Sequence, residues 1–164
     1  MDFTIRKVEE SDAHAIAQIL QELGWHQWVS SNPHDKVVSQ IQQHISQCAA
    51  DDSHSVYVAE SPQKGVIGYI TVHWIPCLFI ERLRGYVSDL FIQEDSRGQG
   101  VGSKLLAVVI SESQLKGCHS VTALTRRERE SYKQGFYSKQ GWVERGNVVD
   151  FIYEIPQLTT SLRS

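Results

Sequence analysis

The stretch that decides the fold reads Arg97-Gly98-Gln99-Gly100-Val101-Gly102. A run typical of a β-strand, residues 86–92, precedes it, and an amphipathic helical pattern begins inside it. Glycines at alternate positions leave backbone N–H groups uncovered, and the first turn of a helix adds its own unpaired N–H groups and positive dipole end. This arrangement can hold a phosphate or pyrophosphate, and Arg97 adds a full positive charge beside it.

Two common nucleotide-binding loops do not match this stretch. A dinucleotide fingerprint needs its third glycine one position later and an acid about 20 residues further on. A nucleoside-triphosphate loop needs Gly-Lys-Ser or Gly-Lys-Thr, which Gly102-Ser103-Lys104 does not supply. From composition alone, the stretch could also be a glycine-rich strand-to-helix turn that binds no ligand.

The rest of the chain predicts alternating strands and helices in one domain, residues 1–164, with a frayed tail at 156–164. The pattern predicts strands at 3–8, 55–60, 66–75, 86–92, 120–125, 142–145 and 148–155. It predicts helices from an N-cap at Asp12 to Gly24, around 37–45, from about 100 to 116 and over 130–140. The order β-α-α-β-β-β-α-β-α-β-β indicates an α/β (α+β) fold with a central mixed sheet flanked by helices on both faces.

The bulk properties exclude several classes of protein. The formal net charge of −3 disfavours a nucleic-acid partner, and no apolar run approaches membrane-spanning length. Three cysteines, Cys48, Cys77 and Cys118, lack metal-ligand spacing and are typical of reduced thiols, so we expect a cytoplasmic protein without a signal peptide. No two of the seven histidines lie three to five residues apart, so no metal site is predicted.

Three motifs occur in the order found in one enzyme family. They are Asp89-Leu90-Phe91-Ile92, the loop 97–102, and Phe136-Tyr137-Ser138-Lys139-Gln140-Gly141-Trp142. With these motifs the chain resembles the GNAT superfamily of N-acetyltransferases, whose Arg-x-x-Gly-x-Gly signature binds acetyl-CoA. The resemblance covers roughly residues 55–155 and implies the family's fold, in which the fourth and fifth strands splay apart.

The resemblance also implies where acetyl-CoA, the acetyl donor, binds. The CoA pyrophosphate is expected on the backbone of Arg97, Gly98, Gln99, Gly100, Val101, Gly102 and Ser103. The pantetheine arm is expected along the exposed main chain of Leu90, Phe91 and Ile92, since its two amides can pair with an open strand edge. The Ile92 N–H is then placed to stabilise negative charge on the acetyl oxygen.

The chemistry needs a base and an acid. A substrate amine with a pKa of about 10.4 must lose a proton before it attacks, and the leaving thiolate needs a hydrogen-bond donor. Tyr137 lies at the position of the family's general acid; as an alternative it is a core aromatic. The family's usual basic Glu is replaced by Ser88, so Asp89, Glu81, His73 or a water relay are the candidates for the base.

Two residues and one segment have further interpretations under the family resemblance. Asp89 could instead orient the backbone near the splay, and Glu130 stands where the family usually has an Asn that contacts CoA. In the family the first helices shape the acceptor pocket, and here they are joined by a segment with Trp25, His26 and Trp28.

The leading hypothesis is therefore an enzyme that transfers acetyl from acetyl-CoA to a primary amine of a small molecule or peptide by direct attack in a ternary complex. A non-catalytic acyl-CoA-binding sensor on the same fold is the alternative. A dinucleotide-dependent oxidoreductase is disfavoured by the glycine spacing. No nucleic-acid or membrane partner is expected, and a homodimer is left open.

Overall fold

Five strands form one mixed sheet within residues 2–155, the part of the chain that the computed structural model describes. The strands are β1 (Thr4–Lys7), β2 (His54–Ser61), β3 (Gly65–Ile75), β4 (Arg84–Ile92) and β5 (Ser120–Ala123). They lie in sequence order, with β4 and β5 parallel and the other neighbours antiparallel. The sheet belongs to the first of two compact units, Met1–Thr125 and Arg126–Ser164.

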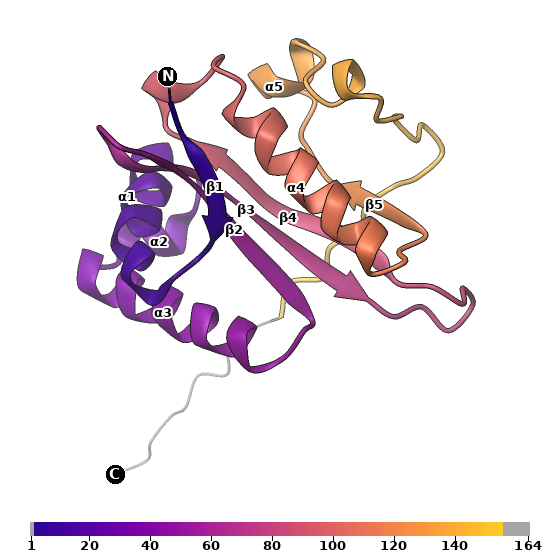
Figure 1. The fold of residues 1–164 in the computed structure, drawn as a ribbon, viewed down its shortest axis with the longest axis horizontal. Coiled ribbons are helices and arrows are strands. Elements are labelled where there is room, and N and C mark those ends of the chain that lie inside the picture. The colour runs from indigo at the N-terminus through magenta and orange to yellow at the C-terminus, as the bar shows by residue number, and fades with distance from the viewer. Residues whose placement is uncertain (1, 156–164) are drawn as a thin grey trace. The chain divides into compact units, whose positions relative to one another are not determined.

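Helices cover both faces of this sheet, which confirms the predicted fold class (Figure 1). One face carries α1 (Ala13–Leu23), α2 (Gln27–Ser31) and α3 (His34–Ala50); the other carries α4 (Val101–Leu115). The first unit also contains two 3-10 turns, η1 (Glu10–Asp12) and η2 (Glu94–Ser96). Side chains alternate between the faces of a strand, so Val56 and Val58 of β2 face α1 and α3 while Ser55 and Tyr57 face α4.

Apolar residues at helical spacing explain how these helices pack. Ile16 and Ile19 of α1 and Val37 and Val38 of α3 are buried in one cluster with Val58 of the sheet. On the other face, α4 buries four of the five apolar residues of its predicted pattern, Val101, Leu105, Leu106 and Val109, and leaves the fifth, Ile110, half-buried. The helix ends also match the prediction, because Gly24 and Gly117 adopt the left-handed conformation that glycine favours at a helix C-terminus.

The predicted N-cap role of Asp12 is wrong in detail. Its side chain makes no capping bond to α1 but accepts from the Glu9 N–H at 2.8 Å, which closes the η1 turn before the helix. Asp12 also forms a two-pronged ion pair with Arg6 of β1, at 2.8 and 2.9 Å. The buried carboxylate therefore joins β1 to the start of α1, because a guanidinium can satisfy both of its oxygens at once.

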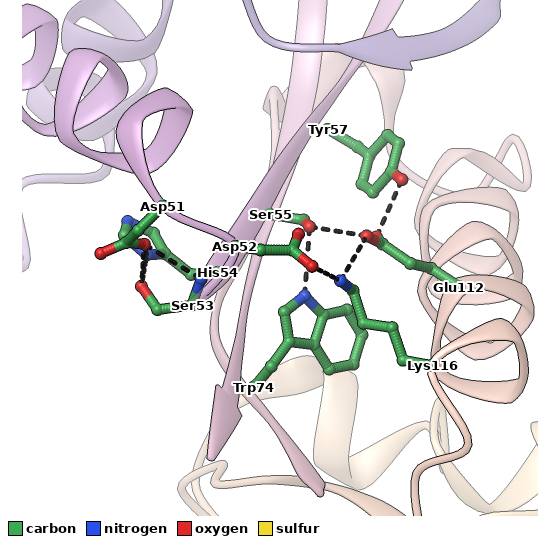
Figure 2. A network of polar contacts seen from close by, with 9 residues as sticks. All are labelled: Asp51, Asp52, Ser53, His54, Ser55, Tyr57, Trp74, Glu112 and Lys116. Carbon is green, nitrogen blue, oxygen red and sulfur yellow. Dashed lines mark hydrogen bonds and ion pairs between the residues drawn. The ribbon is translucent and has the colours of Figure 1, made fainter. Parts of the chain in front are cut away.

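A second polar network fixes α4 to the sheet (Figure 2). The largely buried Glu112 carboxylate accepts hydrogen bonds from Ser55 Oγ and Tyr57 OH, both at 2.8 Å. Trp74 Nε1 donates to Ser55 Oγ at 3.2 Å, and Lys116, one turn further along α4, reaches Asp52 at 2.5 Å. Burial and the bond to Glu112 raise the pKa of Tyr57, so its hydroxyl stays a donor.

The second unit departs from the prediction in two places. The predicted helix 130–140 is two short pieces, α5 (Glu130–Lys133) and the 3-10 turn η3 (Ser138–Gln140). Gly135, with φ +67°, lies between them, and a left-handed residue interrupts a helix.

The predicted final strands at 142–145 and 148–155 are also wrong, because residues 142–155 contain no strand. A strand needs a partner for its backbone and cover for its apolar face, and here Val143, Phe151 and Ile152 are exposed. The predicted frayed tail, 156–164, lies outside the described residues.

We expect Glu112→Ala to lower the free energy of unfolding by about 2–3 kcal/mol, because the hydroxyls of Ser55 and Tyr57 lose a charged acceptor in a buried place. Urea denaturation followed by circular dichroism measures the change. Glu22→Ala is the matched control: Glu22 is an exposed helical glutamate on α1, and its loss should change stability by less than about 0.5 kcal/mol. Equal effects of the two substitutions would show that the network does not anchor α4.

Candidate functional site

The pairing between β4 and β5 covers only half of β4. The parallel ladder joins Arg84–Val87 to Ser120–Ala123, and β4 then continues to Ile92 without a strand on that side within the described first unit. The two strands therefore separate after Val87, at the place where the family resemblance predicted a splay.

The direction of the backbone groups shows which residues this open edge presents. The Gln93 N–H bonds to Ile67 O on β3 at 2.9 Å. Backbone groups of successive strand residues point to alternate sides, so Phe91 also pairs with β3, whereas Leu90 and Ile92 direct their N–H and C=O to the open edge. The contact of Arg97 Nε with Ile92 O, at 3.1 Å on that side, agrees with this assignment.

The glycine loop follows directly. Arg97 leaves the η2 turn with an extended backbone, Gly98 and Gly100 have φ of +72° and +82°, and α4 begins at Val101. No side chain caps the first turn of α4, and no atom lies within 4 Å of where a Cβ at Gly98 or Gly100 would be. The loop thus offers uncovered N–H groups toward open space, which fits a bound pyrophosphate.

An extra residue in β4 shapes the neighbouring side-chain site. Val87 pairs with Val72 and Asp89 with Thr71, so Ser88 is a β-bulge without a partner on β3. Ser88 Oγ donates to Asp89 Oδ2 at 2.8 Å and lies 2.9 Å from His73 Nε2. Of the residues that the sequence offered as base, the structure brings together Asp89 and His73, joined by the serine that replaces the family's acid.

The hydrogen-bond pattern assigns the tautomer of His73. Ser88 has one hydroxyl hydrogen, and it goes to Asp89; His73 Nε2 must therefore donate to Ser88 Oγ, which leaves Nδ1 with the lone pair. The pKa of His73 lies below its usual value of 6.5, because of partial burial and repulsion by His54, with Asp89 acting in the opposite direction. His73 is consequently a neutral imidazole with one basic nitrogen at neutral pH.

His54 lies directly beside His73. Their rings stack at 5.3 Å with an interplanar angle of 17°, because β2 and β3 pair these two residues. His54 Nδ1 is 2.7 Å from Ser53 Oγ, which in turn donates to Asp51 (Figure 2). The sequence reasoning did not identify His54, since the contact arises from strand register rather than from spacing along the chain.

A cavity of about 490 Å³ opens beside these residues on the face covered by α1, α2 and α3. Its lining comes from both the helices and strands β2 to β4. It consists of Ile16, Leu20, His26, Val29, Ile41, His44, Ile45, Gln47, Cys48, His54, Val56, Tyr69, Thr71, His73 and Asp89. Burial raises the pKa of the Cys48 thiol, so this cysteine is not activated as a nucleophile.

Of the other residues that the sequence placed near the acceptor or proposed as the base, only some line the cavity. His26 lines the cavity, and the rings of Trp25 and His26 both meet Phe91 edge-on, at 5.8 and 6.0 Å. Trp28 is 45% exposed and does not line the cavity. Glu81, another predicted base, is exposed in the loop between β3 and β4 and is not part of the lining.

Tyr137 belongs to the second unit. It lies at the start of η3, partly buried, with its ring against Phe136 and Trp142 at 5.1 and 5.4 Å. Burial raises the pKa of Tyr137 above 10.0, partly offset by Arg129, so the hydroxyl keeps its proton at neutral pH. Glu130 begins α5 and accepts a hydrogen bond from Gln134 at 3.0 Å.

Within residues 2–155, no three His, Cys, Asp or Glu side chains gather as metal ligands do. None of the helices in that range combines the length and the apolar character that crossing a membrane requires.

Known proteins share both sequence and fold with this chain. A rice protein (Oryza sativa subsp. japonica) named "Probable glucosamine 6-phosphate N-acetyltransferase 2" is 30% identical over 105 residues. That match covers 60% of this chain and 59% of the rice protein, so the chain spans less than two thirds of this relative's length.

Solved structures agree in fold. A transcriptional regulator from Bacillus halodurans C-125 superposes with a TM-score of 0.76 at 21% identity, covering 93% of this chain and all of that one. Glucosamine-6-phosphate N-acetyltransferase from Arabidopsis thaliana gives a TM-score of 0.74 at 18% identity, covering 94% of this chain and 100% of that one. These likenesses confirm the predicted fold.

The model of the acetyltransferase (GNAT) family matches residues 17–142, a span that includes the open edge of β4, the glycine loop and Tyr137. The chain therefore belongs to the acetyltransferase (GNAT) family.

Proposed function

We propose that this protein transfers an acetyl group from acetyl-CoA to a primary amine by direct attack within a ternary complex. The observation that carries this proposal is that the unpaired edge of β4 is followed along the chain by the glycine loop and by a first turn of α4 that no side chain caps. The relatives are named for an amino sugar phosphate; for this chain the proposal covers primary amines of small molecules or peptides.

The residues of the open edge and the loop fit acetyl-CoA. Leu90 and Ile92 would pair with the amides of its pantetheine arm, while Phe91 anchors the strand through its buried ring. The loop from Arg97 through Gly98, Gln99 and Gly100 to Val101, Gly102 and Ser103 would hold the pyrophosphate. Bound acetyl-CoA supplies a thioester-activated acetyl group, and the Ile92 N–H would stabilise charge on its oxygen.

We assign the base to the bulge. Asp89 accepts the hydrogen bond that Ser88 Oγ donates, so Ser88 Oγ in turn accepts a hydrogen bond from His73 Nε2. The other ring nitrogen, His73 Nδ1, then has the lone pair that would accept a proton from the amine. Asp89 then acts twice: it sets the tautomer of His73 through Ser88, and it stabilises the imidazolium that forms. The same division of labour, a carboxylate that orients an imidazole, operates in acyl-transfer triads.

Tyr137 is proposed as the acid. Its protonated hydroxyl would donate a hydrogen bond to the leaving thiolate, which is otherwise a poor leaving group in a desolvated site. Its position in the Phe-Tyr-x-x-x-Gly motif supports the role, as does its raised pKa.

Gly100→Val should raise the acetyl-CoA dissociation constant at least about tenfold, or about 1.4 kcal/mol, because a β-branched residue does not adopt φ +82° and the N–H groups of the loop are displaced. Isothermal titration calorimetry measures the change. Gly117→Val is the control, since Gly117 has a similar φ of +66° at the opposite end of α4. Unchanged affinity in a folded Gly100→Val protein would contradict the binding site.

Tyr137→Phe should lower the rate constant for transfer about 10²-fold, the low end of acid–base contributions, and leave acetyl-CoA affinity unchanged. Stopped-flow detection of CoA release gives the rate. The control is Tyr132→Phe in the same unit, where the hydroxyl bonds Glu144 at 2.8 Å and no catalytic part is assigned. If both variants turn over at the wild-type rate, Tyr137 is only a packing residue.

The pH dependence of kcat/KM tests the base. His73 must be neutral to accept a proton, so activity should fall as the pH drops through the His73 pKa, which lies below 6.5. Asp89→Asn removes a negative charge that raises this pKa, so the acidic limb should move to lower pH while the plateau drops. His54→Asn removes the repulsion, so the limb should move to higher pH.

His73→Asn should abolish that limb and leave an activity that rises only toward the amine's own pKa of about 10.4. An unchanged acidic limb in His73→Asn would remove His73 from the mechanism. Tight acetyl-CoA binding without transfer to any amine would favour the non-catalytic sensor instead.

A further inference from the structure

The cavity beside His73 is the place for the acceptor. His73 and Asp89 line it. Asp89 precedes Leu90 on β4, the strand with the open edge, and His73 is on β3, which pairs with the other edge of β4. The base must contact the amine, so an amine that reaches His73 Nδ1 enters the cavity with the remainder of its molecule.

Aliphatic side chains are the largest group among the fifteen residues that line this cavity, followed by four histidines. Six branched side chains from α1, the α2 helix, α3 and β2 face it: Ile16, Leu20, Val29, Ile41, Ile45 and Val56. His44 and Gln47 are exposed on α3 and give the cavity a polar rim. A ligand that fills the space therefore buries apolar surface, which contributes about 25 cal/mol per Å².

The polar part of the lining does not suit an anion. It contains neither lysine nor arginine, and its one carboxylate, Asp89, repels negative charge. Phosphate groups are usually bound by arginine or lysine, and the lining has neither. Its nearest substitutes are four histidines, one of which, His26, is the N-cap of the five-residue helix α2. Asp89 instead attracts the positively charged ammonium before His73 takes its proton.

We propose, on the basis of the function proposed above, that the acceptor is a primary amine on an apolar chain or ring without an anionic group. This differs from the phosphorylated amino sugar for which the relatives are named. The volume of about 490 Å³ is within the usual range of small-molecule pockets, which suits a small amine.

Paired acceptors test the proposal with the full chain and saturating acetyl-CoA. Hexylamine and 6-aminohexanoate share a chain and differ by a carboxylate; glucosamine and glucosamine 6-phosphate differ by a phosphate. We expect kcat/KM for hexylamine to exceed that for 6-aminohexanoate at least about tenfold. We expect kcat/KM for glucosamine to exceed that for glucosamine 6-phosphate by a larger factor. Preference for the anionic member of either pair would overturn the inference.

A variant locates the ligand. Ile41→Phe fills the cavity from α3, so kcat/KM for hexylamine should fall at least about tenfold while shorter alkylamines are less affected. Ile110→Phe makes the same change on α4, away from the cavity, and should leave both values unchanged. Equal effects of the two variants would show that hexylamine does not occupy this space.

Binding separates this inference from the proposed function. If no amine is acetylated, calorimetric titration of hexylamine and 6-aminohexanoate into the protein still measures the preference of the cavity. Selective hexylamine binding without transfer would support the ligand class and refute the catalytic proposal. Absence of hexylamine binding to the wild-type protein would refute the ligand class.

Discussion

The extra residue in β4, Ser88, determines which side chains face the cavity. In a regular strand Val87, Asp89 and Phe91 would share one face, and Val87 is buried on the α4 side. The bulge changes the alternation, so Asp89 lines the cavity and Phe91 joins the core beneath α1. Without the insertion, the carboxylate would lie on the opposite face from His73, and the aromatic contacts of Trp25 and His26 with Phe91 would be lost.

The short β5 strand is the second constraint. It pairs with four residues of β4 and stops, so the backbone of Leu90 and the N–H of Ile92 remain available to an extended ligand. The start of α4 lies next to this edge because Arg97 bonds back to Ile92 O. The far end of α4 is fixed by Glu112 and Lys116, which bond to β2 and the turn before it. The N-terminus of α4 is therefore held beside the open edge of β4 by contacts at both ends of α4.

How much the sequence predicts depends on whether the signal is local. The glycine-rich turn before α4 and the helical pattern of α4 are local signals, and both elements were predicted correctly. So were the two strands that flank the turn at residues 61–65. The pairing of His54 with His73 is not a local signal. A regular hairpin around that turn pairs His54 with Val72, and the bulge at Ala59 and Glu60 shifts the partner to His73. No composition rule places a bulge, so register, and with it half of the candidate site, required the structure.

In the second unit, local sequence signals predicted elements that the structure does not contain. Residues 148–155 have high strand propensity, yet propensity alone does not form a strand without a neighbour to share its hydrogen bonds. The predicted helix over 130–140 failed for a local reason that the sequence did contain: Gly135 takes a left-handed backbone and ends the first turn. A glycine six residues before Gly141 is ambiguous between a tolerated interior position and a stop, and here it is a stop.

The walls of the cavity and the weakness of the base belong to one chemical problem. In the proposed mechanism His73, whose pKa is lowered by partial burial and by His54, takes a proton from an amine whose pKa in water is about 10.4, so the transfer is uphill by the gap between the two pKa values. Transfer of an ammonium from water into an aliphatic cavity disfavours its charged form and lowers its pKa by as much as about 3–5 units. Ile16, Val29 and Ile45 would thus reduce the same gap that the imidazole has to bridge. An anionic group on the acceptor would act against this, as Asp89 in the lining does, because a nearby negative charge stabilises the ammonium. The apolar part of the lining would therefore serve the proposed proton transfer as well as the fit of the acceptor.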